Sequence, residues 1–226
     1  MRNIPPIDSS YIGDAETLIF SSGPFWDLEA VFGVLKGVVS THALYIGGMA
    51  EDPTFERIGD HSEAVRVDFF SSLIDFSSLL DVFFASHDPY SLTLDRRYAS
   101  TIFYFMPHHL AQASERIERM NKDHPGVQTS IYPVTASYSA ETHNQKHYLF
   151  QSRLLSAEFH EIYKTRENII NSTAAARVNG ILGGAWSESL YDEISLCGLS
   201  PESEKYLKER LSDNMNKEKA QNHEIY

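Results

Sequence analysis

The turn around Gly23 has the residue types and spacing of a binding or reactive site. Gly23 ends an apolar run over 17–20 that is typical of a strand, and Pro24 follows where a helix begins. The first N–H groups of a helix have no partner within the helix, so polar and anionic groups gather there. Phe25 and Trp26 are adjacent and cannot both face the core. Either one of them lies at the mouth of the turn, or the two wedge the helix against a sheet.

Three other sets of polar residues offer weaker chemistry. His61 and Glu63 are two apart at the start of a predicted strand, so they share one face, as a site or as a solvated strand end. His108 and His109 are adjacent on a predicted helix, point in different directions and make a poor chelate, so we expect no metal. Residues 95–97, Asp-Arg-Arg, predict a surface loop with locally paired charge.

Cys197 is the single cysteine, which excludes an internal disulfide framework. It is either a small buried apolar residue or a thiol with a redox role. The sequence contains no G-x-S-x-G, P-loop, H-E-x-x-H or spaced cysteine motif, so the common hydrolase, nucleotide and zinc signatures are missing. No cofactor is expected.

Composition narrows the classes of partner. The chain has 226 residues, 42% of them hydrophobic, enough for one globular domain with an extension. Its net charge of −12 argues against nucleic acid or an anionic membrane as the main partner, because binding phosphates needs clustered basic charge. No run of 18 apolar residues could span a membrane, and the first residues lack the apolar segment of a secretory signal. We therefore expect a cytoplasmic protein.

The predicted elements follow the order β-α-β-β-α-β, the ferredoxin-like split βαβ pattern, with an extra helix and strand. Apolar patterning predicts strands over about 17–21, 38–46, 63–69, 100–105 and 127–134, and helices over about 24–36, 76–86 and 107–124. The fold class is α/β, a roll with a mixed sheet of about five strands. The predicted core consists of apolar residues on inward faces: Leu18, Phe20, Leu28, Phe32, Val39, Val65, Val67, Leu80, Phe83, Ile102 and Phe103.

Three regions differ in composition. Residues 1–16 are polar with two adjacent prolines and predict an N-terminal arm, and residues 17–150 hold the αβ pattern. Residues 151–226 predict a helical C-terminal extension, with a last helix that begins at Pro201 and a polar tail that frays from Asp213 onward.

Several ordered motifs together resemble the A-type peptide methionine sulfoxide reductases. The stretch Gly-Pro-Phe-Trp at 23–26 is similar to the family's Gly-Cys-Phe-Trp-Gly. The resemblance continues in register through these segments: Gly37-Val38, Tyr45-Ile46-Gly47-Gly48, Pro53-Thr54-Phe55, His61-Ser62-Glu63-Ala64-Val65, His87-Asp88-Pro89, Tyr98, Ile102-Phe103-Tyr104, Ala140-Glu141, Gln145-Lys146, Tyr148 and Asn171 to Gly180. It makes residues 17–150 a methionine sulfoxide reductase A-like domain.

The resemblance implies a mechanism and roles. In the family a cysteine thiolate at the helix N-terminus attacks the sulfoxide sulfur of oxidised methionine in proteins or peptides, and thioredoxin later supplies electrons. Phe25 and Trp26 match the pair that holds the methyl group, while Tyr45 and Tyr98 match the tyrosines that bind the sulfoxide oxygen. Glu63 matches the acid that protonates or hydrogen-bonds this oxygen.

Three departures from the family pattern concern this chemistry. Pro24 occupies the position of the nucleophilic cysteine, and proline has no thiol. The loop before Tyr98 is shorter than in the family, so the substrate-binding aspartate is lost or replaced by Asp95. Asp60 stands where the family has a glycine.

Three functions remain open from the sequence. The chain is a catalytically inactive relative that keeps a pocket for methionine sulfoxide or methionine, or an interaction protein whose pocket is vestigial. Alternatively, it is an enzyme that uses Cys197 or an external thiol, and only then is thioredoxin a partner.

Overall fold

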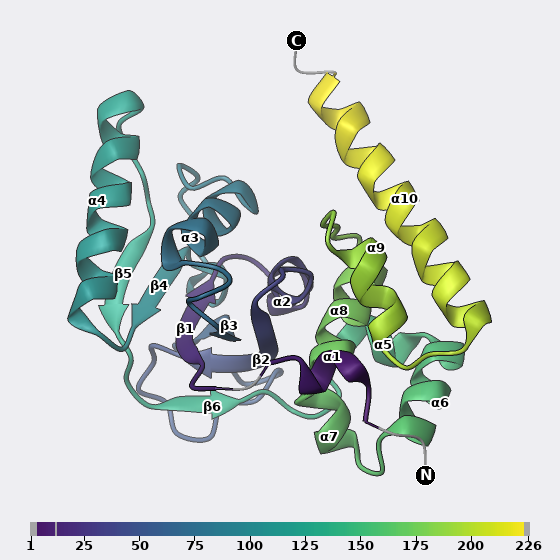
Figure 1. Cartoon of the computed structure of the whole chain (residues 1–226). Coiled ribbons are helices and arrows are strands. Elements are labelled where there is room, and N and C mark those ends of the chain that lie inside the picture. The colour runs from purple at the N-terminus through teal and green to yellow at the C-terminus, as the bar shows by residue number, and fades with distance from the viewer. Residues whose placement is uncertain (1–3, 12, 224–226) are drawn as a thin grey trace.

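A mixed β-sheet carries the N-terminal part of the chain, and a group of helices from the C-terminal part packs beside it (Figure 1). The structure is a computed structural model that describes residues 4–11 and 13–223. Its strands are β1 (Glu16–Ser21), β2 (Val38–Ile46), β3 (Ser62–Phe69), β4 (Thr101–Tyr104), β5 (Ser130–Pro133) and β6 (Ser137–Ser139). Its α-helices are α1 (Pro6–Ser9), α2 (Phe25–Gly33), α3 (Phe76–Ala85), α4 (Pro107–Asp123), α5 (His147–Gln151), α6 (Arg153–Ile162), α7 (Arg166–Ile170), α8 (Thr173–Leu182), α9 (Leu190–Glu193) and α10 (Pro201–His223). Two short 3-10 helices are η1 (Arg96–Tyr98) and η2 (Ile194–Leu196).

The sheet confirms the predicted α/β class and the split βαβ pattern. Its strand order is β5-β4-β1-β3-β2-β6, so β1 lies between β4 and β3, antiparallel to both. The extra strand β5 pairs in parallel with β4 and is shorter than the stretch 127–134 that apolar patterning predicts. A sixth strand, β6, which the sequence analysis did not predict, pairs with β2 at the opposite edge.

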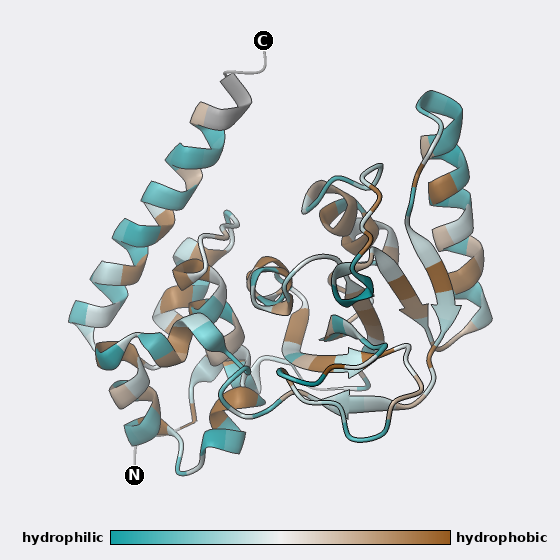
Figure 2. Cartoon of the chain, turned by 180° about the vertical axis from the view of Figure 1, so that it is seen from behind, coloured by the Kyte–Doolittle hydropathy of each residue, from teal (hydrophilic) through white to brown (hydrophobic). Residues whose placement is uncertain are grey.

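The main core lies between one face of the sheet and helices α2 and α3, which both carry hydrophobic residues coloured brown in Figure 2. The Phe20 ring is 4.7 Å from the Phe32 ring and 5.1 Å from the Phe83 ring, which joins β1 to both helices. Val65 and Val67 are fully buried, as predicted. Phe103 is buried too, but on the other face of the sheet, because neighbours along a strand point to opposite sides.

For one residue, Val39, the predicted place in the core is wrong. Val39 is half-buried, and Val38 is the fully buried residue. The register of the β2–β3 pair shifts between Val38 and Ser40, which indicates a β-bulge. A bulge adds one residue to one strand, so it changes which side chain faces the core.

The C-terminal helices pack directly on α2. A Cβ atom on Gly33 of α2 would lie 2.5 Å from the Ala176 carbonyl oxygen of α8, and one on Gly180 would lie 2.6 Å from the Ala30 carbonyl oxygen. The two helix backbones therefore approach as closely as glycine allows. Helix α2 consequently has one face on the sheet and another on α8.

Part of the N-terminal segment is structured rather than a free polar arm. Residues Pro6–Ser9 form the short helix α1, whose Ile7 is buried in the C-terminal helix cluster. The Asp8 carboxylate accepts the Ala174 N–H at 3.0 Å, at the first turn of α8. Asp8 also accepts the hydroxyl of Tyr163, so the segment is tied to two helices of the extension.

The last helix, α10, continues past Asp213 to His223. Leu207 and Leu211 are fully buried, and the Asn214 side chain donates to the carbonyls of Ile181 and Ala185. The residues beyond are mostly hydrophilic (Figure 2), but Lys, Glu and Ala are strong helix formers, so a polar helix continues. No helix in the part of the chain that the structure describes is long and apolar enough to cross a membrane.

Candidate functional site

The candidate site forms at the turn between β1 and α2. Gly23 has a φ of 66°, a conformation that glycine adopts without strain, and its N–H donates to the Tyr98 carbonyl at 3.3 Å. Pro24 is the exposed N-cap residue, and the helix begins at Phe25 rather than at Pro24 itself. The turn thus presents Pro24 to solvent at a helix N-terminus and leaves the Phe25 N–H available to another partner.

Glu63 of β3 is that partner. Its side chain is buried, and its Oε2 accepts the Phe25 N–H at 3.1 Å. Burial raises the pKa of Glu63, although the Phe25 hydrogen bond and the Arg97 charge oppose the shift. Glu63 therefore lies at the helix start with an increased tendency to hold a proton.

An aromatic cluster surrounds this helix start. The Phe25 ring lies 5.8 Å from Trp26 and 5.9 Å from Tyr45, which is the cross-strand partner of Glu63. The Trp26 ring stacks on Phe55 at 5.5 Å and on His147 at 4.0 Å. Phe25 and Tyr45 are fully buried, and Trp26 is half-buried.

Tyr45 is held by Glu141. The Tyr45 hydroxyl donates to the Glu141 carboxylate at 2.7 Å, and the Phe55 N–H donates to the other oxygen at 2.9 Å. Burial raises the pKa of Glu141, but these hydrogen bonds outweigh it and lower the pKa to about 2. Burial and the same carboxylate raise the pKa of Tyr45 far above its usual value, so it stays protonated. The Tyr45 hydroxyl proton thus stays in the hydrogen bond to Glu141.

Residues 95–97 were predicted to form a surface loop, and this prediction is wrong for Arg97. Its Nε lies 3.6 Å from Glu63 Oε1, its guanidinium lies 5.2 Å from the Phe55 ring centre, and it donates to the Phe55 carbonyl. The reason is local: the Asp95 carboxylate accepts the Arg97 N–H at 2.9 Å and caps the short helix η1, which turns Arg97 inward. Asp95 is exposed, and its carboxylate is engaged in this capping hydrogen bond.

The structure therefore brings together four of the five predicted substrate-binding residues: Phe25, Trp26, Tyr45 and Glu63. Tyr98 contacts the turn through its backbone carbonyl. No role for Arg97, His147 or Glu141 follows from the sequence alone. Ala140-Glu141 belonged to the motifs of the family resemblance, which was the available signal for Glu141. Arg97 and His147 belong to none of those motifs, and only the chain path places them here.

Cys197 lies in a different part of the molecule. It is fully buried in the cluster formed by the C-terminal helices, and its Sγ donates to the Glu193 carbonyl at 3.4 Å. Burial raises the pKa of the Cys197 thiol to about 12. These surroundings fit the apolar alternative and not a reactive thiol.

We expect Cys197 in the folded protein to react with iodoacetamide at least about a hundredfold more slowly than in the unfolded chain, because only the thiolate reacts. The measurement is the rate of mass increase at neutral pH with and without denaturant. Labelling at similar rates in both states would contradict this prediction and restore Cys197 as a redox candidate.

Comparison with known proteins identifies relatives of this chain. The family model "Peptide methionine sulfoxide reductase" matches residues 16–177, which extends beyond residue 150 into α8. The chain is 33% identical over 187 residues to peptide methionine sulfoxide reductase A5 of Oryza sativa subsp. japonica, covering 80% of this chain and 73% of the relative. It is 32% identical over 209 residues to peptide methionine sulfoxide reductase of Drosophila melanogaster, covering 90% and 83%.

Solved structures support the same fold. Methionine sulfoxide reductase A of Corynebacterium diphtheriae is 25% identical, with a TM-score of 0.53 over 63% of this chain and 77% of the other. Reduced Mxr1 of Saccharomyces cerevisiae is 20% identical, with a TM-score of 0.54 over 58% and 82%. By the extent of the family match and by the identity and coverage of these relatives, the chain belongs to the peptide methionine sulfoxide reductase family.

Proposed function

We propose that this chain is a non-catalytic member of the family that binds methionine sulfoxide side chains of proteins without reducing them. The observation that carries the proposal is Pro24 at the N-cap of α2, where the resemblance places the nucleophilic cysteine. Proline offers no thiol to attack sulfur. The single cysteine is buried in another cluster, so it does not replace the missing nucleophile, and the chain forms no internal disulfide for thioredoxin to reduce.

Two buried polar atoms without a hydrogen bond support ligand binding. Among the described residues, Glu63 Oε1 and Trp26 Nε1 are buried and make no hydrogen bond, although Arg97 Nε lies 3.6 Å from Glu63 Oε1 as an ion-pair partner. A buried polar group without a partner costs free energy, and such groups in native proteins call for an explanation. A sulfoxide oxygen accepts hydrogen bonds from a protonated carboxyl and from an indole N–H, and its methyl group suits contact with Phe25 and Phe55.

Arg97 favours the second candidate, an interaction protein with a vestigial pocket. Its guanidinium lies close to Glu63 Oε1 and to the Phe55 ring, so a ligand that reaches Glu63 must displace it. The two candidates differ in what removal of this side chain does. If the site binds sulfoxide, Arg97→Ala strengthens binding; if it is vestigial, the variant binds no better than the unmodified protein.

The test is a titration with N-acetyl-methionine-S-sulfoxide methylamide, followed by the Trp26 indole N–H signal in NMR. We expect saturable binding of the S epimer, weaker binding of the R epimer and of the unoxidised compound, and at least about threefold tighter binding in Arg97→Ala. In a calorimetric titration, which does not need the Trp26 signal, Trp26→Ala should lose binding, and Trp186→Ala, the other tryptophan, serves as its matched control. Equal shifts with both epimers would contradict a specific sulfoxide site.

Binding should also depend on pH. The donor to the sulfoxide is protonated Glu63, whose pKa is raised in the folded protein, so affinity is highest at low pH and falls as pH rises through that pKa. Glu63→Gln carries a permanent N–H donor and should bind with a flat pH profile. A profile that is the same in both proteins would exclude Glu63 as the donor.

A further inference from the structure

We propose that Glu16, His108 and His109 form a binding site for a divalent transition-metal ion of the zinc class, between the start of β1 and the start of α4. One potential ligand atom from each of these three side chains lies within 4.8 Å of the other two. Glu16 is 92 or more positions away from the two histidines along the chain, so the tertiary fold creates the cluster. It is separate from the site at α2 described above.

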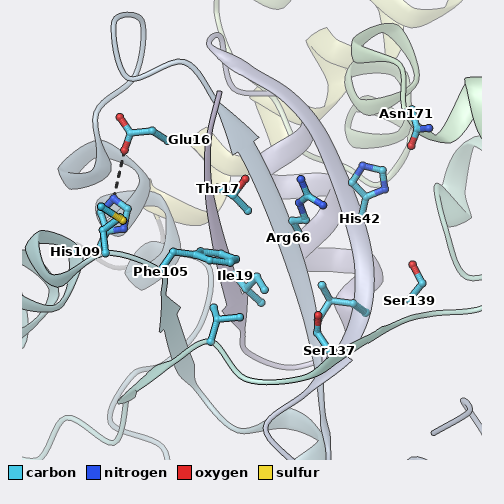
Figure 3. A pocket seen from close by; sticks show the side chains of 13 residues that line it. Glu16, Thr17, Ile19, His42, Arg66, Phe105, His109, Ser137, Ser139 and Asn171 are labelled. Carbon is cyan, nitrogen blue, oxygen red and sulfur yellow. Dashed lines mark hydrogen bonds and ion pairs between the residues drawn. The ribbon is translucent and has the colours of Figure 1, made fainter. Parts of the chain in front are cut away.

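The measured separation fits a shared metal ion. Glu16 Oε2 and His109 Nε2 are 3.3 Å apart, which is long for a hydrogen bond to a carboxylate (Figure 3). Two ligands bound at about 2.0–2.1 Å to a tetrahedral zinc ion lie about 3.3–3.4 Å from each other. An ion could therefore replace the proton between these atoms with almost no movement of either residue.

The three side chains are of the types that bind such ions. Two imidazoles and one carboxylate are a ligand set typical of zinc and also suit nickel and copper.

Packing and a backbone hydrogen bond hold one of these ligands, His109, firmly. His109 is 2% exposed, its ring packs edge-on against Phe76 at 5.0 Å, and its N–H donates to the Met106 carbonyl at the first turn of α4. Adjacent histidines were predicted to make a poor chelate, yet at this helix start their ring centres are 4.1 Å apart. His108 is exposed, so its side chain can turn toward the ion.

A route for entry exists. Glu16 and His109 line a groove of about 880 Å³ on the surface of the sheet, together with Thr17, Phe105 and Met106 (Figure 3). Three protein ligands leave one tetrahedral position for water or a small anion. A bound ion would strengthen the link between β1 and α4, and its stabilisation of the folded chain would grow with the logarithm of the ion concentration above the dissociation constant.

The experiment is a calorimetric titration of the full chain, carrying no histidine tag, with Zn²⁺ in a buffer that does not bind metal. We expect one equivalent to bind and to raise the melting temperature. His109→Ala, His108→Ala and Glu16→Gln should each weaken binding more than about tenfold. Glu16→Gln retains a hydrogen-bond acceptor for His109 and should stay folded without Zn²⁺, which separates loss of the ligand from loss of the fold.

His160→Ala is the matched control, because His160 is an exposed helix histidine outside the cluster. It should leave affinity and stoichiometry unchanged. Co²⁺ in place of Zn²⁺ should give the visible absorption of a four-coordinate site, lost in Glu16→Gln. The proposal is overturned if the unmodified protein takes up no single saturable equivalent. It is also overturned if the three variants bind as the unmodified protein does, or if His160→Ala weakens binding as much as His109→Ala.

Discussion

The unmodified protein is expected to reduce methionine-S-sulfoxide no faster than a protein-free control, with either dithiothreitol or thioredoxin as the electron donor. The reason is Pro24, which removes the one group that must form a bond to sulfur at the start of α2. Removing a catalytic nucleophile lowers rates by several orders of magnitude, so any residual turnover falls below detection. The measurement is chromatographic conversion of a methionine sulfoxide peptide into the methionine peptide over hours.

A variant restores the missing group. Pro24→Cys places a thiol at the N-terminus of α2, where the helix dipole lowers its pKa, beside Glu63. We expect it to convert about one methionine sulfoxide per chain to methionine without added thiol, as the new thiol becomes a sulfenic acid. Further turnover should require dithiothreitol, because no second cysteine lies nearby to resolve the sulfenic acid. Adding Arg97→Ala should increase the rate, since Arg97 lies against Glu63. Pro24→Ser is the matched control and should stay inactive.

The outcome that contradicts this prediction is specific. Turnover in the unmodified protein that disappears on Cys197→Ser would make Cys197 a relocated nucleophile, despite its burial. Turnover that survives this change would require a route without any cysteine.

The second large effect concerns stability. Lys146 and Glu29 form an ion pair at 2.7 Å with both side chains fully buried. Lys146 Nζ also donates to the Thr41 carbonyl, and the Glu29 carboxylate accepts the Lys146 N–H at 3.0 Å and the Thr41 hydroxyl at 3.2 Å. Helix α2 and strand β2, which follow one another in the sequence, meet the start of α5 at this pair, and Lys146 is 105 or more positions from its partners. His147, which stacks on Trp26, is the next residue.

Lys146→Met is expected to destabilise the protein by about 3–5 kcal/mol, because it leaves the Glu29 carboxylate buried without a counter-charge. For a domain of this size, this lowers the melting temperature by roughly 6–20 °C. Adding Glu29→Gln should recover much of the loss, since the amide keeps an acceptor for the Lys146 N–H and removes the unpaired charge. Thermal unfolding followed by circular dichroism measures all three proteins.

The matched control is the exposed pair of Lys205 and Glu209 on α10, whose charged atoms are 3.9 Å apart. Lys205→Met should leave the melting temperature almost unchanged, because exposed ion pairs contribute little. A small effect of Lys146→Met, comparable to this control, would show that the buried pair does not hold the three segments together.

The sequence by itself determined the fold class and the main limit on the chemistry. The alternation around Val65 and Val67 and the helical spacing of Leu28 and Phe32 are local patterns, and each reports directly on burial. Pro24 is equally local, because a side chain without a thiol has none in any fold. The predicted order of strands and helices therefore matched the sheet, and the family followed from motifs in register.

Only the tertiary structure decided which charged groups meet. Arg97 contacts Glu63, Lys146 contacts Glu29, and Glu16 lies beside His109, each across 34 or more positions of sequence. A charge pattern does not report such pairs, because their energy depends on burial and on separation in space. The bulge that buries Val38 in place of Val39 depends likewise on a partner strand elsewhere in the chain. So do the hydrogen bonds of Asn214 that anchor α10. Packing between distant elements thus decided that Arg97 lies against Glu63 in the candidate site. The local residue types decided what chemistry is possible there.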